Sequence, residues 1–141
     1  MGMWFRDQLE RMSACVAREF SIPVGNVPRT VFSNTNARES EYCPTEQRIL
    51  IDRDSRLPKL LAFIWFHEIY HWIQFTVDKR EYPLDFYSNI RDYNDEQYRQ
   101  FWSEKEANAF ALYMCEKYGF DWVTPVWLTE DYMKEIRDYV W

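Results

Sequence analysis

The chain has 141 residues, of which 19% are aromatic and three are glycine, with a formal net charge of -6 and a pI near 5.0. This length suits one domain spanning residues 1–141, with a core of large rings in which helices dominate. The negative charge argues against a protein that holds nucleic acid through phosphate contacts.

No targeting or membrane signal is evident in the sequence. The N-terminus lacks a charged start followed by a long apolar run, which predicts no secretory signal. The longest apolar run, residues 60–66, is too short to span a bilayer. Cys15, Cys43 and Cys115 are odd in number and scattered, which favours a reducing compartment over a disulfide framework. We therefore expect a cytoplasmic protein.

The first part of the chain predicts a helix followed by a small sheet. Apolar residues at spacings of three and four over residues 4–20 predict an amphipathic helix, which two prolines and a glycine then end. Residues 30–33, 39–43 and 47–52 have the composition of strands, with a turn around 34–36. We expect these strands to form a small antiparallel sheet, in which Pro44 marks an edge or a bulge.

The central predicted helix covers residues 59–77 and contains His67-Glu68-Ile69-Tyr70-His71. The two histidines lie one helical turn apart on one face, so both can bind one metal ion. Glu68 lies close enough to reach a water on that ion without binding the ion itself. Imidazole suits zinc, and a catalytic zinc has three protein ligands and one position for water. The stretch is typical of the metal-binding helix of a zinc hydrolase; the alternative is two core histidines bonded to backbone carbonyls.

The second part of the chain predicts a connection and two more helices. Residues 78–94 are polar with scattered aromatics, and either cover the site or form plain surface. Asn94 and Gln97 form a predicted capping box that begins a second long helix, which continues to residue 118 and ends at Gly119. Thr129 begins a short final helix.

The third metal ligand must be a carboxylate or a thiolate, because the chain has only two histidines. Glu104 and Asn108 are four residues apart and share a face of the second long helix. Glu106 points about 200° away from Glu104, so at most one of them faces the metal, and periodicity leaves both open. Cys43 is the thiolate candidate, as peptide deformylases pair such a helix with an upstream Cys. Its neighbours lack the glycines of those enzymes, which favours an inert thiol.

The two helices together resemble the ImmA/IrrE family of metallopeptidases. A Glu followed four residues later by Asp or Asn is similar to thermolysin-like peptidases, in which the Glu binds zinc and the later residue bonds a metal-bound His. The sequence Glu104-Lys105-Glu106-Ala107-Asn108-Ala109-Phe110-Ala111 is similar to the family's E-x-x-A-N-x-F-A helix, and a predicted strand precedes the metal helix. The resemblance covers roughly residues 47–115. It implies a zincin-like α+β fold with Zn²⁺ bound by His67, His71 and Glu104. It also implies that Asn108 hydrogen-bonds the other ring nitrogen of a metal-bound histidine.

The resemblance implies a zinc metallopeptidase acting on a protein or peptide, and members of the family often cleave helix-turn-helix repressors of phages or mobile elements. In the expected reaction Glu68 takes a proton from the attacking water and returns it to the leaving amine. Tyr82, Tyr87, Tyr93 or an Arg could stabilise the oxyanion. An exposed strand edge beside the metal helix could bind an extended peptide, or the sheet could only back the core.

The same residues are also compatible with two other functions. One is a catalytically silent protein of the same fold that binds or sequesters a partner protein. The other is a purely structural zinc site, which requires four protein ligands.

Overall fold

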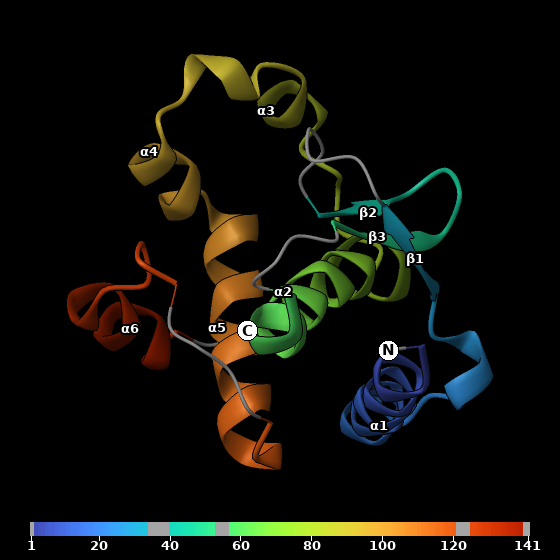
Figure 1. The fold of residues 1–141 in the computed structure, drawn as a ribbon. Helices are drawn as coiled ribbons and strands as arrows, with labels where there is room; N and C mark the ends of the chain where they lie inside the picture. The colour runs from blue at the N-terminus through green and yellow to red at the C-terminus, as the bar shows by residue number, and fades with distance from the viewer. Residues whose placement is uncertain (1, 34–39, 53–56, 121–124, 140–141) are drawn as a thin grey trace.

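The computed structural model describes residues 2–33, 40–52, 57–120 and 125–139, which form an α+β fold (Figure 1). The first half contains α1 (Gly2–Phe20), the 3₁₀ turn η1 (Val24–Asn26), and the strands β1 (Arg29–Ser33), β2 (Glu41–Cys43) and β3 (Arg48–Asp52). The second half contains α2 (Leu57–Trp72), the π-helical turn η2 (Ile73–Val77), α3 (Leu84–Ser88), the 3₁₀ turn η3 (Ile90–Asp92), α4 (Asp95–Gln100), α5 (Trp102–Tyr118) and α6 (Glu130–Arg137). Within these described ranges, no helix has the length and apolarity that a membrane crossing requires.

Helix α2 lies at the centre of the molecule. Its sequence is apolar on all sides, and Phe63, Trp65 and Phe66 are almost completely buried, as expected for a helix surrounded by protein. It packs against α5 on one side and against β2 and β3 on another, while α1 also contacts it (Figure 1). The Trp65 indole donates a hydrogen bond to the Thr30 hydroxyl, 2.8 Å away, and so ties α2 to β1. Polar groups on α2 therefore lie in an interior of low dielectric constant.

The amphipathic N-terminal helix predicted from the sequence is confirmed. Phe5, Met12 and Val16 of α1 are buried in the same core as α2, and Leu9 and Phe20 pack partly against it. The spacing of three and four residues places these side chains on one face.

The sheet has the predicted strands, but the expectation that it is antiparallel is wrong for one of its two pairings. The strand order is β1-β3-β2, with β2 antiparallel to β3 and β1 parallel to β3. Ile49, Leu50 and Ile51 of β3 are all buried, which favours the central position between two paired neighbours. Because β2 occupies one edge of β3, β1 pairs with the other edge, as a strand that is not its neighbour in the chain. The turn predicted around residues 34–36 lies outside the described residues.

The second long helix is interrupted, which the sequence did not predict. The capping box of Asn94 and Gln97 is present and begins α4, and Gly119 ends α5 in the left-handed conformation with φ of 69°. Between them, Phe101 is extended, with φ of -66° and ψ of 140°. Its ring stacks on Phe86 of α3 with centroids 3.7 Å apart, so tertiary packing explains the break.

Candidate metal centre

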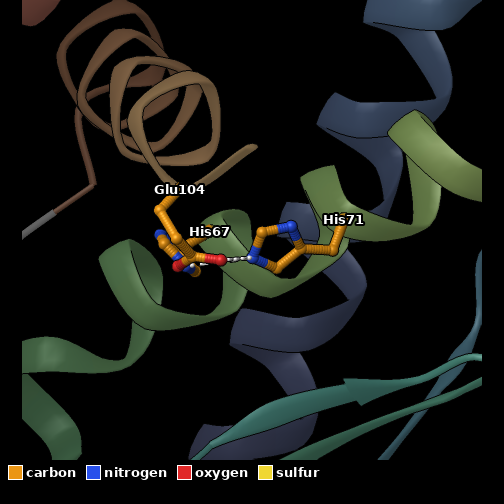
Figure 2. A group of neighbouring side chains, drawn as sticks. All are labelled: His67, His71 and Glu104. Atoms are coloured by element: carbon orange, nitrogen blue, oxygen red, sulfur yellow. Dashed lines mark hydrogen bonds and ion pairs between the residues drawn. The ribbon is translucent and has the colours of Figure 1, made fainter. Parts of the chain in front are cut away.

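Two histidines of α2 and a glutamate of α5 meet in the interior (Figure 2). The Nε2 atoms of His67 and His71 lie 2.9 and 3.0 Å from the two carboxylate oxygens of Glu104. The two Nε2 atoms are 3.2 Å apart. Glu104 and His71 are buried, and the His67 side chain is 15% exposed, so solvent reaches the group on the His67 side. These three residues, called the metal group below, could hold a metal ion.

A chain of hydrogen bonds through α5 and α6 orients the ring of His67. Its Nδ1 lies 2.7 Å from Oδ1 of Asn108. The Asn108 amide is fixed because its Nδ2 donates to the Tyr132 hydroxyl at 3.0 Å, and that hydroxyl donates to the Arg99 carbonyl at 2.8 Å. Since an amide oxygen only accepts, Nδ1 of His67 carries the proton and Nε2 presents a lone pair to Glu104.

A separate set of hydrogen bonds orients His71. Its Nδ1 lies 2.9 Å from Oε1 of Gln74, which belongs to the π-helical turn η2. The Gln74 amide nitrogen donates to the backbone carbonyl of Ser103 at 3.0 Å, which leaves the amide oxygen for the imidazole. Nδ1 of His71 therefore carries a proton, and when the ring is neutral its Nε2 presents a lone pair.

When both imidazoles are neutral, the metal group brings together two lone pairs and one carboxylate, all of them acceptors. Acceptors at 2.9–3.2 Å repel one another in a buried site unless positive charge lies among them. Around a tetrahedral zinc with ligands at about 2.0–2.1 Å, the ligand atoms lie about 3.3 Å from one another. The chemistry and the spacing of the three ligand atoms thus fit a divalent metal ion.

The pKa shifts of His71 and Glu104 also favour a positive charge within the metal group. Burial alone would lower the pKa of His71, but the Glu104 carboxylate outweighs burial and raises this pKa to about 9. Burial would raise the pKa of Glu104, but the two imidazoles outweigh it and hold this pKa well below its usual value. Glu104 is therefore ionised at neutral pH, and the group attracts positive charge, as a proton on His71 or as a metal ion.

Glu68 lies at the side of the metal group and is not part of it. Its Oε1 is 3.9 Å from Nε2 of His67, and its Oε2 has no hydrogen-bond partner among the described residues. The side chain is buried, and this burial raises the pKa of Glu68 to about 7. A carboxyl group with such a pKa can both accept and release a proton near neutrality.

The connection between α2 and α4 contributes Tyr87 to the metal group. The Tyr87 hydroxyl donates to Oε2 of Glu104 and lies 2.9 Å from the Ser103 hydroxyl. Burial, and then the Glu104 carboxylate, raise the pKa of Tyr87, so it stays a neutral donor. Tyr82 stacks on Tyr87 with ring centroids 5.2 Å apart, whereas Tyr93 is 43% exposed and packs against Phe86. Of the three predicted tyrosines, Tyr87 is the one bonded to the metal group.

The other ligand candidates lie elsewhere. Glu106 faces Arg80, whose guanidinium donates to both carboxylate oxygens at 2.8 and 2.7 Å. The Cys43 thiol lies on β2, 3.7 Å from the carboxylate of Glu41. Cys115 is buried, which raises its thiol pKa to about 12. Of these ligand candidates, Glu104 is the one that the described structure places against both histidines.

Sequence reasoning missed two residues that orient the imidazoles. Gln74 lies three residues after His71, which places it near the same helical face, so its spacing was an available signal. Tyr132 acts from α6, and nothing in the sequence connects that helix with the histidines. The predicted contact of Asn108 with a histidine is found, and Tyr132 explains which way the amide points.

Comparisons of the chain with protein-family models, with curated proteins and with solved structures found no match. The resemblance to ImmA/IrrE peptidases therefore depends on the two helical motifs and on the strand that precedes the first of them.

Proposed function

We propose that this protein is a zinc-dependent metallopeptidase that hydrolyses a peptide bond in a protein substrate. The observation that carries the proposal is the convergence of two imidazole Nε2 atoms and the Glu104 carboxylate beside Glu68, a buried carboxyl with one oxygen that has no hydrogen-bond partner among the described residues. His67, His71 and Glu104 would hold the metal ion. Imidazole and carboxylate ligands suit zinc, and a set of three leaves a position for water.

When bound, zinc would act as a Lewis acid on the peptide carbonyl and lower the pKa of a water molecule toward 7. The proton transfers would be carried out by a residue of the chain. Glu68 would accept the proton of the attacking water on a carboxylate oxygen and return it to the leaving amine. Burial favours the protonated form of this carboxyl, which helps Glu68 to hold the proton between the two transfers.

Tyr87 would hold the Glu104 carboxylate in a fixed orientation through its hydroxyl. Its raised pKa keeps it a donor at neutral and mildly alkaline pH. The Asn108 and Gln74 amides would keep the two imidazoles in the tautomer that binds a metal through Nε2.

The substrate is proposed from the resemblance. A helix-turn-helix repressor of a phage or mobile element is the first protein to test, and the net charge of -6 favours a protein over a nucleic acid. A catalytically silent protein with the same metal group would bind such a partner without cutting it.

The test is a cleavage assay with the full chain. Wild type and Glu68→Gln are loaded with zinc and incubated with a mixture of unstructured peptides and with repressors encoded near the gene, and fragments are identified by mass spectrometry. We expect zinc-dependent cleavage by wild type and a fall of about 100-fold or more in Glu68→Gln, because proton transfer is lost while the ligands remain.

Equal zinc content in the two proteins is the control for that comparison. Retained cleavage by Glu68→Gln would contradict the role of Glu68. A zinc-loaded wild type that binds a repressor and leaves it intact would favour the sequestering protein.

A further inference from the structure

Gln74 is a completely buried polar residue in the π-helical turn that follows α2. Its amide oxygen lies 2.9 Å from Nδ1 of His71. Its amide nitrogen donates to the Ser103 carbonyl at 3.0 Å and to Oε1 of Glu106 at 3.3 Å. Every polar atom of this amide therefore has a partner, which is what a buried amide requires.

Glu106 and Arg80 close a ring of contacts around Gln74. The Arg80 guanidinium donates to both oxygens of Glu106, and the Arg80 backbone N–H donates to the backbone carbonyl of Gln74 at 2.9 Å. The guanidinium also lies over the Trp102 ring, 4.5 Å from its centroid. Arg80 thus holds Gln74 through its main chain and, by way of Glu106, through its side chain.

The direction of the amide follows from this ring. Ser103 and Glu106 both present acceptors, so the Gln74 nitrogen must face them and the oxygen must face His71. The Arg80 charge compensates the Glu106 carboxylate, which would otherwise add negative charge close to the metal group. A flipped amide would oppose its oxygen to two acceptors and leave buried polar groups unpaired, which is unfavourable.

We propose that Gln74, held by the Glu106–Arg80 pair, is a positioning residue that fixes the tautomer and aim of His71. This inference rests on the proposed function insofar as His71 binds a metal. It gives Glu106 a role different from the one the sequence left open for it: Glu106 anchors the support of a ligand and is not itself a ligand. The π-helical turn matters because it carries Gln74 at the position where its side chain reaches back to His71.

The test combines zinc affinity with NMR of the imidazoles in the zinc-loaded full chain. The sequence contains only two histidines, so labelling His with ¹⁵N gives one Nδ1–H signal for each ring. Gln74→Met keeps the length and apolar bulk of the side chain and removes the acceptor. We expect it to weaken zinc binding about 10- to 100-fold and to shift or lose the His71 signal while the His67 signal stays.

Asn108→Leu is the matched control, since it removes the corresponding acceptor from His67. We expect it to disturb the His67 signal and to leave that of His71. Arg80→Gln, at a partly exposed position, serves if the buried variant does not fold, and should shift the His71 signal alone.

Zinc binding by wild type, together with unchanged affinity and an unmoved His71 signal in Gln74→Met, would overturn this inference and leave the proposed function standing. Equal disturbance of both rings in Gln74→Met would also overturn it, because general loosening of the core would then explain the result. Absence of zinc binding by wild type would overturn both proposals.

Discussion

Two carboxylates, Glu19 and Glu104, each join α5 to another helix, and their surroundings differ in kind. Glu19 of α1 accepts hydrogen bonds from the Tyr113 and Tyr118 hydroxyls at 2.8 and 2.9 Å, and from the Lys117 ammonium at 2.8 and 3.0 Å. This set, called the Glu19 cluster below, supplies its own cation and its own donors. Its chemistry is complete and requires only a structural explanation.

Glu104, in contrast, has no lysine or arginine among the ion-pair partners that the described structure gives it. Among the described residues its ion pairs are with His67 and His71, whose neutral rings would present lone pairs to it, and the Tyr87 and Tyr98 hydroxyls hydrogen-bond to it. A buried carboxylate surrounded in this way is costly unless a proton or a metal ion is added. The comparison shows how a group that could hold a cation differs from a salt bridge: the neighbouring amides accept the Nδ1 protons of the two imidazoles, on the side away from the carboxylate.

The largest expected effect comes from removing the carboxylate of the metal group. Glu104→Ala should reduce zinc affinity by about 10³-fold or more, because it deletes one of three ligands. Isothermal titration with zinc measures this directly. Glu106→Ala is the matched control on the same helix and should bind zinc far more tightly than Glu104→Ala. If Glu106→Ala bound zinc more weakly than Glu104→Ala, Glu106 and not Glu104 would be the metal ligand.

A smaller effect is expected when one hydroxyl is removed from either region. Tyr132→Phe deprives Asn108 of its partner and should weaken zinc binding about threefold to tenfold, since it acts on His67 through one intermediate. Tyr113→Phe removes a hydroxyl from the Glu19 cluster and should leave zinc affinity unchanged. Equal zinc affinities for the two variants would argue against the support of His67 by α6.

The smallest effect concerns stability as a function of pH. Burial opposes ionisation of Glu19, but its bonds to Lys117, Tyr113 and Tyr118 outweigh burial and lower its pKa below the usual 4.5. A group with a lowered pKa stabilises the folded state above its unfolded pKa, and this contribution is lost as pH falls through the folded-state value.

Glu19→Gln should therefore lower the free energy of unfolding at pH 7 by less than about 1 kcal/mol, since solvent screens the pair with Lys117, and by still less as the pH falls below about 4.5. Urea unfolding at several pH values checks this, with zinc affinity as the control. A loss that stays constant down to pH 3 would mean that the charge of Glu19 contributes nothing.

The sequence predicted those features that depend on local signals. The spacing of His67 and His71, the capping box at Asn94 and the left-handed end at Gly119 each depend on residues within one or two turns, and all are present. The choice of Glu104 over Glu106 came from the resemblance, because both faces of that helix are apolar and periodicity could not separate them.

Features that depend on distant contacts were not predictable in the same way. The parallel pairing of β1 with β3 joins strands that are not consecutive in the chain, and the break at Phe101 follows from stacking on Phe86. The orientation of His67 by Tyr132 joins residues from three helices. Such pairs leave no spacing pattern in the chain, so only the fold reveals them.

The central claim is that two imidazoles and the Glu104 carboxylate bind one divalent ion. X-ray absorption at the zinc edge, on the full chain loaded with one equivalent of zinc, tests it most directly. We predict two imidazole nitrogens and carboxylate oxygen at about 2.0–2.2 Å, with one imidazole lost in His71→Ala. A sulfur ligand at about 2.3 Å, or a wild-type chain that binds no zinc, would contradict the account.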